Sequence, residues 1–343
     1  MSTSTRTKVP RASVLGVGDA LGAGDSYLVT NMLPPELANV AFEKMKTEVK
    51  WQTMHHRGGE VPRLVAVEGE VLEDGSFPVY RHPADESPPL APFSPTVALI
   101  REHVQKVLNH PVNHVLIQYY RTGKDYISEH SDKTIDVVRG SNIVNVSLGA
   151  QRVMTLRVKK DRAEKVADSS NSGASTAPGT SGTSPSASDS PSEQWTVVSG
   201  KSHGPPRTSQ RIPLPHNSMF VMGLETNAKW LHGINHDNQP LKTKSPEERI
   251  ENGGRISLTF RHIGTFLSAD ETLIWGQGAK GKVKDRAGQV VNDKKEAQKL
   301  IWQFGVENQQ SEFDWKRAYG RGFDVLHLTT RDSEEDKDDK EKA

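Results

Sequence analysis

Apolar and polar residues alternate over several short stretches of the chain, which is the pattern of β-strands with one buried face. Turn-forming residues such as Gly, Pro and Asn separate these stretches. The strands that this pattern predicts lie at residues 27–30, 63–69, 77–82, 114–120, 141–150, 152–160, 211–223, 228–234 and 255–264. Many short strands separated by turns are typical of an antiparallel sandwich or barrel.

Two segments have apolar residues at helical spacing instead. The first follows the prolines at positions 34 and 35, and its apolar residues are Leu37, Val40, Ala41 and Met45. The second is "SPTVALIREHVQKVL" (94–108), where Ser94 stands at the N-cap position and Pro95 at the first helical position. We therefore expect a mainly β fold with these helices packed on the outside of the barrel.

Changes in composition divide the chain. Residues 1–25 are expected to form a flexible arm, and residues 26–264 the main domain. Within the domain, residues 57–95 are rich in Gly and Pro, which indicates an extended surface segment outside the core. Residues 163–194 consist mostly of Ser, Gly, Ala, Pro, Thr and Asp, which predicts a disordered insertion between two strands.

A C-terminal extension is expected at residues 265–330. It contains the helix-like "DKKEAQKLIWQFG", but its pattern indicates no chemistry. Residues 331–343 are a run of charges, which predicts a disordered tail.

Charge and cysteine content limit the possible functions. Lys and Arg total 44, Asp and Glu total 43, and there is no cysteine. The charge balance excludes a global attraction to nucleic acid or to anionic membrane, so any nucleic-acid contact must come from a local patch. Histidines and carboxylates remain as the strong metal ligands. Because no apolar run has the length of a membrane span or signal peptide, we expect an intracellular location, in the nucleus, the cytoplasm or both. We also expect a monomer.

A candidate metal site lies in "EHSDKTID" (129–136). His130 and Asp132 are two residues apart, so at a strand end both side chains leave the same face. "KWLHGINHD" supplies His232 as a third ligand, with His236 as a decoy four residues later. Two histidines and one carboxylate on one face of an octahedral iron leave three positions open for a co-substrate and oxygen. The alternative is a solvated turn, the commoner setting of an isolated H-x-D pair.

Two arginines extend this candidate site. Arg255 and Arg261 are six residues apart in the alternating "RISLTFR", so both point to one side. Two cations beside apolar residues require an anion. A dicarboxylate fits, because one end can chelate iron while the other meets an arginine. The alternative is a pair of surface salt bridges on an edge strand.

Together these segments resemble the AlkB-like iron(II)/2-oxoglutarate-dependent dioxygenases. The resemblance rests on "HVLIQYYRTGKDYISEHSD" (114–132), "SLGAQRVMTLR", "WLHGI" and "RISLTFR", whose order and spacing match the family core over roughly residues 110–264. "VPRLVAVEG" (61–69) and "VYRHPADESPPLAPFSPTVALI" (79–100) are similar to its substrate-lid region. The resemblance implies a double-stranded β-helix, the jelly-roll-like barrel that the strand count already indicates.

The resemblance also implies roles for individual residues. The iron(II) ligands would be His130, Asp132 and His232. The residues implied for 2-oxoglutarate are Arg255 at its distal carboxylate, Tyr120 as a hydrogen-bond donor, Arg261 near the chelating carboxylate or the substrate, Gln118 and Ser257. The last two stand where base-repair members usually carry asparagine, and both can still hydrogen-bond the co-substrate.

The implied reaction uses oxygen and 2-oxoglutarate to hydroxylate a C–H bond. On an N-methylated base of DNA or RNA it releases succinate, CO2 and formaldehyde. The candidate substrate contacts are Arg57, Arg63, Tyr80, Arg81, Thr134 and Asp136. Arginine pairs with phosphate and tyrosine stacks on an extruded base, whereas a solvated loop with a packing tyrosine is the alternative. Thr134 replaces the acidic residue of repair members, and Asp136 lies about 6 to 7 Å further along an extended chain, which leaves the target base open.

Three functions compete on this basis. The leading one is oxidative demethylation of alkylated nucleic-acid bases. The second is hydroxylation of a protein side chain or small metabolite by the same iron centre, which the balanced charge and Thr134 favour. The third is a non-catalytic binding module that retains the barrel, and the presence of all three ligands and of Arg255 argues against it.

Overall fold

The computed structural model of the protein describes residues 13–56, 59–83, 88–161 and 208–328. The insertion predicted at residues 163–194 and the tail predicted at residues 331–343 lie outside the described residues. Among the described helices, none is long and apolar enough to cross a membrane. The expected monomeric state stays a prediction.

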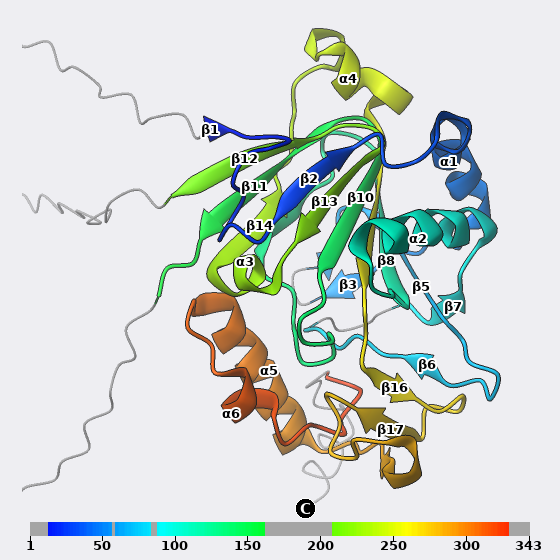
Figure 1. The fold of residues 1–343 in the computed structure, drawn as a ribbon, viewed down its shortest axis with the longest axis vertical. Coiled ribbons are helices and arrows are strands. Elements are labelled where there is room, and N and C mark those ends of the chain that lie inside the picture. The colour runs from blue at the N-terminus through cyan, green and yellow to red at the C-terminus, as the bar shows by residue number, and fades with distance from the viewer. Residues whose placement is uncertain (1–12, 57–58, 84–87, 162–207, 329–343) are drawn as a thin grey trace, which may run out of the picture. The chain divides into compact units, whose positions relative to one another are not determined.

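Eight consecutive strands form the barrel (Figure 1). They are β8 (His114–Tyr120), β9 (Ile127–His130), β10 (Ile143–Gly149), β11 (Arg152–Val158), β12 (Ser209–Leu214), β13 (Ser218–Met222), β14 (Trp230–Ile234) and β15 (Arg255–Arg261). The strands pair antiparallel as one doubled-over hairpin, β11 with β12, β10 with β13, β9 with β14, and β8 with β15. This is the pairing of a double-stranded β-helix, so the predicted fold class is confirmed.

Further strands widen the two sheets of the barrel. The seven-stranded sheet has the order β2-β13-β10-β15-β8-β5-β7, and the five-stranded sheet has the order β1-β12-β11-β14-β9. The added strands are β1 (Ser13–Val14), β2 (Tyr27–Thr30), β5 (Leu64–Gly69) and β7 (Leu90–Pro92).

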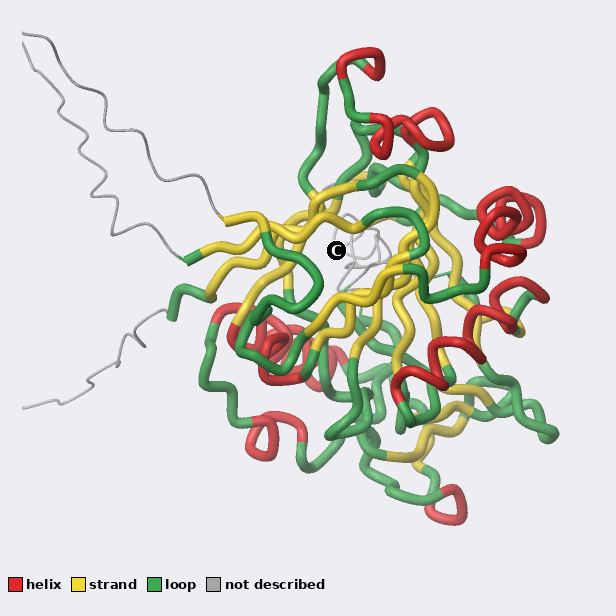
Figure 2. The backbone as a smooth tube through the Cα atoms, turned by 45° about the horizontal axis from the view of Figure 1, so that its top comes forward, coloured by secondary structure: helices red, strands yellow, loops and turns green. Residues whose placement is uncertain are grey.

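Alternation along the strands creates two cores. On β10, Val144 and Val146 face the helices α1 (Pro35–Glu48) and α2 (Pro95–Leu108), which cover the outer face of the seven-stranded sheet. Ile143 faces the other way, into a core shared with Leu156 of the five-stranded sheet. Figure 2 shows the strands in the middle, with helices around them. The polar residues of the inward face lie at the candidate site.

Both predicted helices begin where the prolines indicate, but the cap of α2 differs from the expectation. The Ser94 side chain does not cap α2, because its backbone N–H and its hydroxyl both donate to Glu68, at 2.8 and 3.1 Å. Glu48, at the end of α1, accepts instead from the backbone N–H of Thr96 at 2.8 Å. A carboxylate at a helix N-terminus is favourable, so α1 stabilises the start of α2.

Two segment predictions were wrong in part. Residues 64–69 were expected outside the core, yet β5 lies between β8 and β7, with Val65 and Ala66 buried. Its apolar run "LVAV" is that of a strand covered on both faces. The flexible arm was expected to reach residue 25, yet β1 pairs with β12 and Leu21 is fully buried.

The strand predicted at residues 211–223 is two strands. Asn217, with φ 57°, makes the turn between β12 and β13, and its side chain exchanges hydrogen bonds with the backbone of Leu33. Asparagine tolerates this left-handed conformation better than most residues. The short helix α3 (Leu224–Lys229), which the pattern did not predict, follows β13.

The C-terminal segment packs against the barrel in the same compact unit. The predicted helix is α5 (Lys294–Gln309), followed by α6 (Trp315–Tyr319). The two helices lie next to each other (Figure 1). Their side chains pack with Ile135, which follows β9, in a core that includes Phe304 and Tyr319. The remaining elements are β3 (His55–His56), β4 (Gly59–Glu60), β6 (Phe77–Pro78), η1 (Leu241–Thr243), α4 (Pro246–Arg249), η2 (Ile250–Gly253), β16 (Thr265–Leu267), β17 (Leu273–Gly276), η3 (Lys284–Arg286) and β18 (Gly288–Gln289).

Arg81 and Asp136 form a buried ion pair that is hydrogen-bonded to this segment. Arg81 Nη2 lies 2.7 Å from Asp136 Oδ1, and both side chains are at most 2% exposed. Arg81 also donates to the carbonyls of Gly278 and Phe323, at 2.9 and 2.7 Å. These bonds occupy both side chains, so we do not retain them as substrate contacts.

Removing one partner of this pair leaves an uncompensated buried charge. We expect Asp136→Ala to lower the free energy of unfolding by about 3–5 kcal/mol. Urea denaturation measures this loss, with Lys46→Ala, which breaks an exposed ion pair, as the control without a measurable loss. Equal stability of the two variants would show that the buried pair is not structural.

Candidate active site

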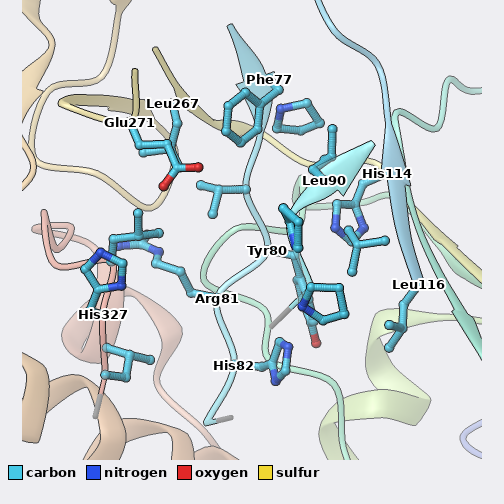
Figure 3. Close-up of a pocket in the computed structure, with 17 residues that line it drawn as sticks. Phe77, Tyr80, Arg81, His82, Leu90, His114, Leu116, Leu267, Glu271 and His327 are labelled. Atoms are coloured by element: carbon cyan, nitrogen blue, oxygen red, sulfur yellow. The ribbon is translucent and has the colours of Figure 1, made fainter. Parts of the chain in front are cut away.

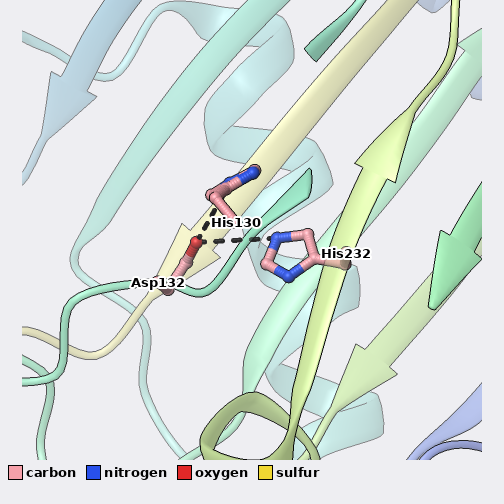
Figure 4. Close-up of side chains that lie close together, drawn as sticks. All are labelled: His130, Asp132 and His232. Carbon is pink, nitrogen blue, oxygen red and sulfur yellow. Dashed lines mark ion pairs between the residues drawn. The ribbon is translucent and has the colours of Figure 1, made fainter. Parts of the chain in front are cut away.

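β9 and β14 bring the three predicted metal ligands together (Figure 4). His130 and His232 are cross-strand partners, with ring centroids 4.3 Å apart. Asp132 follows β9, and its Oδ1 lies 3.7 Å from Nε2 of each histidine. One ligand atom from each of the three residues lies within 4.8 Å of the other two. The decoy His236 is exposed and packs on Tyr126 instead.

Gly233 allows the two strands to approach this closely. A Cβ at this position would lie 2.9 Å from the carbonyl oxygen of Ile127 and 3.0 Å from the nitrogen of Glu129, both on β9. Such distances are shorter than side chains tolerate, so glycine is required beside His232.

Both histidines are in the form that binds metal. Nδ1 of His130 lies 2.8 Å from the carbonyl oxygen of Ser128, so this nitrogen carries the proton and Nε2 has a free lone pair toward Asp132. Burial lowers the pKa of His130, and burial together with His130 lowers the pKa of His232 to about 3. Neutral imidazoles are therefore present at physiological pH.

Asp132 is held as a carboxylate although it is buried. Burial by itself raises its pKa, but Arg261 and the two histidines lower the pKa below its usual range. Arg261 donates to Oδ2 through Nε and Nη2, at 2.9 and 2.6 Å. The backbone of Asp132 exchanges two hydrogen bonds with the side chain of Asn227 on α3, at 2.8 and 3.0 Å. Oδ1 is thus the oxygen that faces the histidines.

These residues fit iron(II). Two neutral imidazoles and one carboxylate, close to one another and on one side of a cavity, form the donor set of non-haem iron oxygenases. Arg261 on Oδ2 of Asp132 and the Ser128 carbonyl on Nδ1–H of His130 are the kind of partners that orient such ligands.

A cavity of about 50 Å³ lies between the two sheets, next to the three ligands. At its wall, Arg255 is 1% exposed. Its Nη2 donates to Asn145 Oδ1 and Ser147 Oγ, at 2.9 and 2.7 Å. Its Nε and Nη1 have no hydrogen-bond partner among the described residues. Burial lowers the pKa of Arg255 to about 10, so it stays charged, and the two unpaired donors fit a carboxylate of 2-oxoglutarate.

The other residues predicted for the co-substrate line the same cavity. They are Tyr120, Gln118, Ser257 and Arg261. Tyr120 stacks with Arg255, whose guanidinium carbon lies 5.3 Å from the ring centre. With its amide oxygen toward Arg63, Gln118 accepts from Arg63 Nε at 2.9 Å and donates to the Tyr120 hydroxyl at 3.3 Å. Ser257 accepts from Asn145 Nδ2 at 2.7 Å.

An open cleft of about 600 Å³ reaches the ligands from outside. Arg63 and Tyr80, two of the predicted substrate contacts, line it together with His130 and Asp132. Tyr80 lies flat against Arg261, whose guanidinium carbon is 4.0 Å from the ring centre, and its hydroxyl accepts from the backbone N–H of Lys133 at 3.0 Å. Tyr80 thus forms part of the cleft wall closest to the metal ligands.

A second cavity, of about 340 Å³, adjoins the cleft (Figure 3). Tyr80, His82 and Leu116 line both. The second cavity continues between apolar residues such as Phe77 and Leu90.

The remaining substrate predictions have other surroundings. Arg57 lies outside the described residues. Arg81 and Asp136 bind each other, as described above. The Thr134 hydroxyl donates to Glu307, which also accepts from the Thr134 backbone N–H at 3.0 Å and from the Tyr319 hydroxyl at 2.7 Å.

The C-terminal helix α5 thus holds the loop that carries Asp132, which the sequence did not indicate. Besides Glu307, Asn308 accepts from the Ser131 backbone N–H at 2.8 Å. Both bonds depend on tertiary packing between segments about 175 residues apart, as their separations of 177 and 173 residues show. Asn145 was also missed, although polar residues on one face of an otherwise apolar strand were a signal.

Comparisons with known proteins place this site in a family. The sequence model of the 2OG-Fe(II) oxygenase superfamily matches residues 25–261. The chain is 30% identical over 172 residues to the human (Homo sapiens) DNA oxidative demethylase ALKBH2, covering 50% of this chain and 48% of that protein. It is 24% identical over 230 residues to alpha-ketoglutarate-dependent dioxygenase alkB homolog 3 of Bos taurus, covering 66% of this chain and 62% of that protein.

The chain therefore belongs to the 2OG-Fe(II) oxygenase superfamily. The relatives confirm the AlkB-like resemblance, and the family confirms iron(II), 2-oxoglutarate and oxygen as the cofactor and co-substrates. The match spans about half the length of ALKBH2.

The neutral His232 predicts a pH-dependent stability of the metal-free protein. Its pKa is about 3 in the folded state and about 6.5 when unfolded, so the unfolded state binds more protons as the pH falls below 6.5. The free energy of unfolding should decrease through this window, by about 2 kcal/mol at pH 5 from this group. Urea denaturation at pH 7 and pH 5, with EDTA, measures it. His232→Gln should show a smaller decrease, and an identical decrease would contradict the assignment.

The hydrogen bonds that Glu307 and Asn308 of α5 accept from the loop around Asp132 predict that α5 affects metal binding. The double substitution Glu307→Ala and Asn308→Ala leaves the N–H groups on either side of Asp132 unpaired. We expect about 10- to 100-fold weaker binding of Co²⁺, measured by calorimetric titration below the unfolding temperature. Gln309→Ala, an exposed neighbour, is the matched control. Unchanged affinity for Co²⁺ in the double variant would show that Glu307 and Asn308 do not position Asp132.

Proposed function

We propose that this protein is an iron(II)- and 2-oxoglutarate-dependent dioxygenase that oxidatively removes alkyl groups from nucleic-acid bases. The observation that carries the proposal is the buried Arg255, whose Nε and Nη1 have no hydrogen-bond partner among the described residues and which lines the same cavity as the three metal ligands. A buried cation with unpaired donors is costly unless an anion binds there.

In this proposal His130, Asp132 and His232 hold the iron(II), and Arg255 binds the distal carboxylate of 2-oxoglutarate. When bound, the iron supplies the oxidative chemistry that couples decarboxylation of 2-oxoglutarate to hydroxylation of a C–H bond. Asn145 and Ser147 orient the Arg255 fork by accepting from Nη2, which leaves Nε and Nη1 for the ligand.

Arg261 lines both the co-substrate cavity and the cleft, and it has a further role that the sequence did not predict. Two of its nitrogens bind Asp132, and only Nη1 is without a partner among the described residues. Its charge keeps Asp132 ionised, and its stacking on Tyr80 fixes a wall of the cleft. Arg261 is therefore a positioning residue in the proposed mechanism.

The cleft supports a nucleic-acid substrate. Tyr80 offers a ring beside the metal ligands, and the largely buried cations Arg63 and Lys133 also line the cleft. A base that leaves its stack needs an aromatic or apolar surface near the reacting centre, and its phosphates need cations. The similarity to the DNA oxidative demethylase ALKBH2 also supports a nucleic-acid substrate.

A second candidate is hydroxylation of a protein side chain or small molecule. It is favoured by Thr134, because its hydroxyl is bound to Glu307 and supplies no acidic group for the amino group of a base.

A turnover assay tests the leading proposal. Wild-type protein with iron(II), 2-oxoglutarate and ascorbate should release formaldehyde from methylated oligonucleotides, in a panel of single- and double-stranded DNA and RNA. His130→Ala should reduce the rate at least about 1,000-fold, since the chemistry is the metal's. His103→Ala, at a half-buried position on α2 outside the cleft, is the control that should retain the wild-type rate.

Two outcomes separate the candidates. Succinate formation without formaldehyde from any nucleic acid would favour the second candidate. No succinate from metal-loaded wild-type protein would contradict a dioxygenase.

A further inference from the structure

Helix α5 forms one wall of the cleft although it lies beyond residue 261, where the family match ends. The residues of α5 that line the cleft are Ile301, Phe304, Gly305 and Asn308. Their spacing places them on one side of the helix. The cleft of this chain thus has a wall that the matched family region does not supply.

The side of α5 that faces solvent has an unusual composition. The exposed residues of this helix are Lys294, Lys295, Gln298, Lys299, Trp302 and Gln309. Three are cations, two are amides, one is aromatic, and none is a carboxylate. Cations interleaved with an aromatic ring match a single-stranded nucleic acid, whose phosphates are negative and whose bases stack.

Trp302 is the most unusual of these residues. It is 64% exposed, the highest value among the exposed large hydrophobic residues of the described chain. Exposing an indole to water forgoes the stabilisation that burial would give, so folding does not explain it. Lys295, Gln298 and Gln309 lie one or two turns away on the same face, over roughly 20 Å of helix.

The lysines also act against the helix. Lys294 and Lys295 occupy its first turn, where the helix dipole disfavours cations by about 0.3–1 kcal/mol each. Asp293 compensates in part by accepting from the backbone N–H groups of Lys295 and Glu296, at 2.8 and 3.2 Å. A phosphate bound by these lysines would supply a reason for their position.

Gly305 lies where the exposed face meets the cleft wall. It is three residues after Trp302 and lines the cleft. A Cβ built on it would meet no atom of the described residues within 4 Å. A glycine inside a helix costs about 0.5–1 kcal/mol relative to alanine. Packing within the chain does not require it, whereas close passage of a ligand backbone would.

We propose that α5 binds the nucleotides next to the target base, with Trp302 as a stacking platform, the lysines on phosphates and Gly305 as the point where the strand enters the cleft. The inference rests on the proposed function and adds a substrate form to it, an unpaired strand of several nucleotides. It gives the C-terminal segment a direct part in substrate binding.

The test compares the kinetics of Trp302→Ala and Trp302→Phe with those of the control Leu99→Ala. Leu99 lies on α2 and is 45% exposed. For a methylated single-stranded oligonucleotide, Trp302→Ala should raise KM about 5- to 150-fold with little change in kcat, the loss of one stacked base. Trp302→Phe should recover most of the affinity. Leu99→Ala should match the wild type.

Comparing KM for a long and a short substrate separates direct binding by Trp302 from a purely structural role, which would affect both substrates equally. Trp302→Ala should leave KM for a methylated mononucleotide unchanged, because that substrate does not reach α5. Lys295→Ala should weaken oligonucleotide binding and reduce the salt dependence by about one phosphate contact. Gly305→Leu, which fills the entry, should raise KM for the oligonucleotide.

The outcomes are distinguishable from failure of the proposed function. If wild-type protein demethylates oligonucleotides and Trp302→Ala has the wild-type KM, the inference about α5 is overturned and the proposed function stands. Equal losses of Trp302→Ala on the mononucleotide and the oligonucleotide would also overturn it. If no nucleic acid is demethylated by the wild type, the proposed function fails first.

Discussion

The site depends on one buried carboxylate, that of Asp132, which contacts Arg261 on one side and the two histidine ligands on the other. Oδ2 of Asp132 accepts a hydrogen bond from Arg261 Nη2 at 2.6 Å, and Oδ1 faces His130 and His232. A buried carboxylate without such a partner would take up a proton and lose its value as a ligand. The arginine therefore keeps the anion available in an environment that would otherwise neutralise it.

Four distant parts of the chain meet around this group. β15 supplies Arg261, α3 holds the Asp132 backbone through Asn227, and β14 supplies His232. The fourth part is α5, where Glu307 and Asn308 accept hydrogen bonds from the backbone of the loop that carries Asp132. Because each part belongs to a different packed element, the geometry of the centre depends on the complete barrel and on the C-terminal segment.

Local patterns predicted much of this arrangement. Alternation fixed the strands, Pro35 and Pro95 fixed the starts of two helices, and the two-residue spacing of His130 and Asp132 pointed to one face. The sequence pattern did not reveal that Asp136 forms a buried ion pair with Arg81. Such pairings join residues far apart in sequence, and no local periodicity encodes them.

The central claim is that the metal ligands and Arg255 form one binding site for 2-oxoglutarate. Calorimetric titration of 2-oxoglutarate into Mn²⁺-loaded protein tests it most directly. We predict one binding event per chain, at least about 100-fold weaker in Arg255→Gln, which loses two charge-assisted hydrogen bonds, and weakened again when Mn²⁺ is removed. Equal affinity in the wild type and Arg255→Gln, or an affinity independent of metal, would contradict the account.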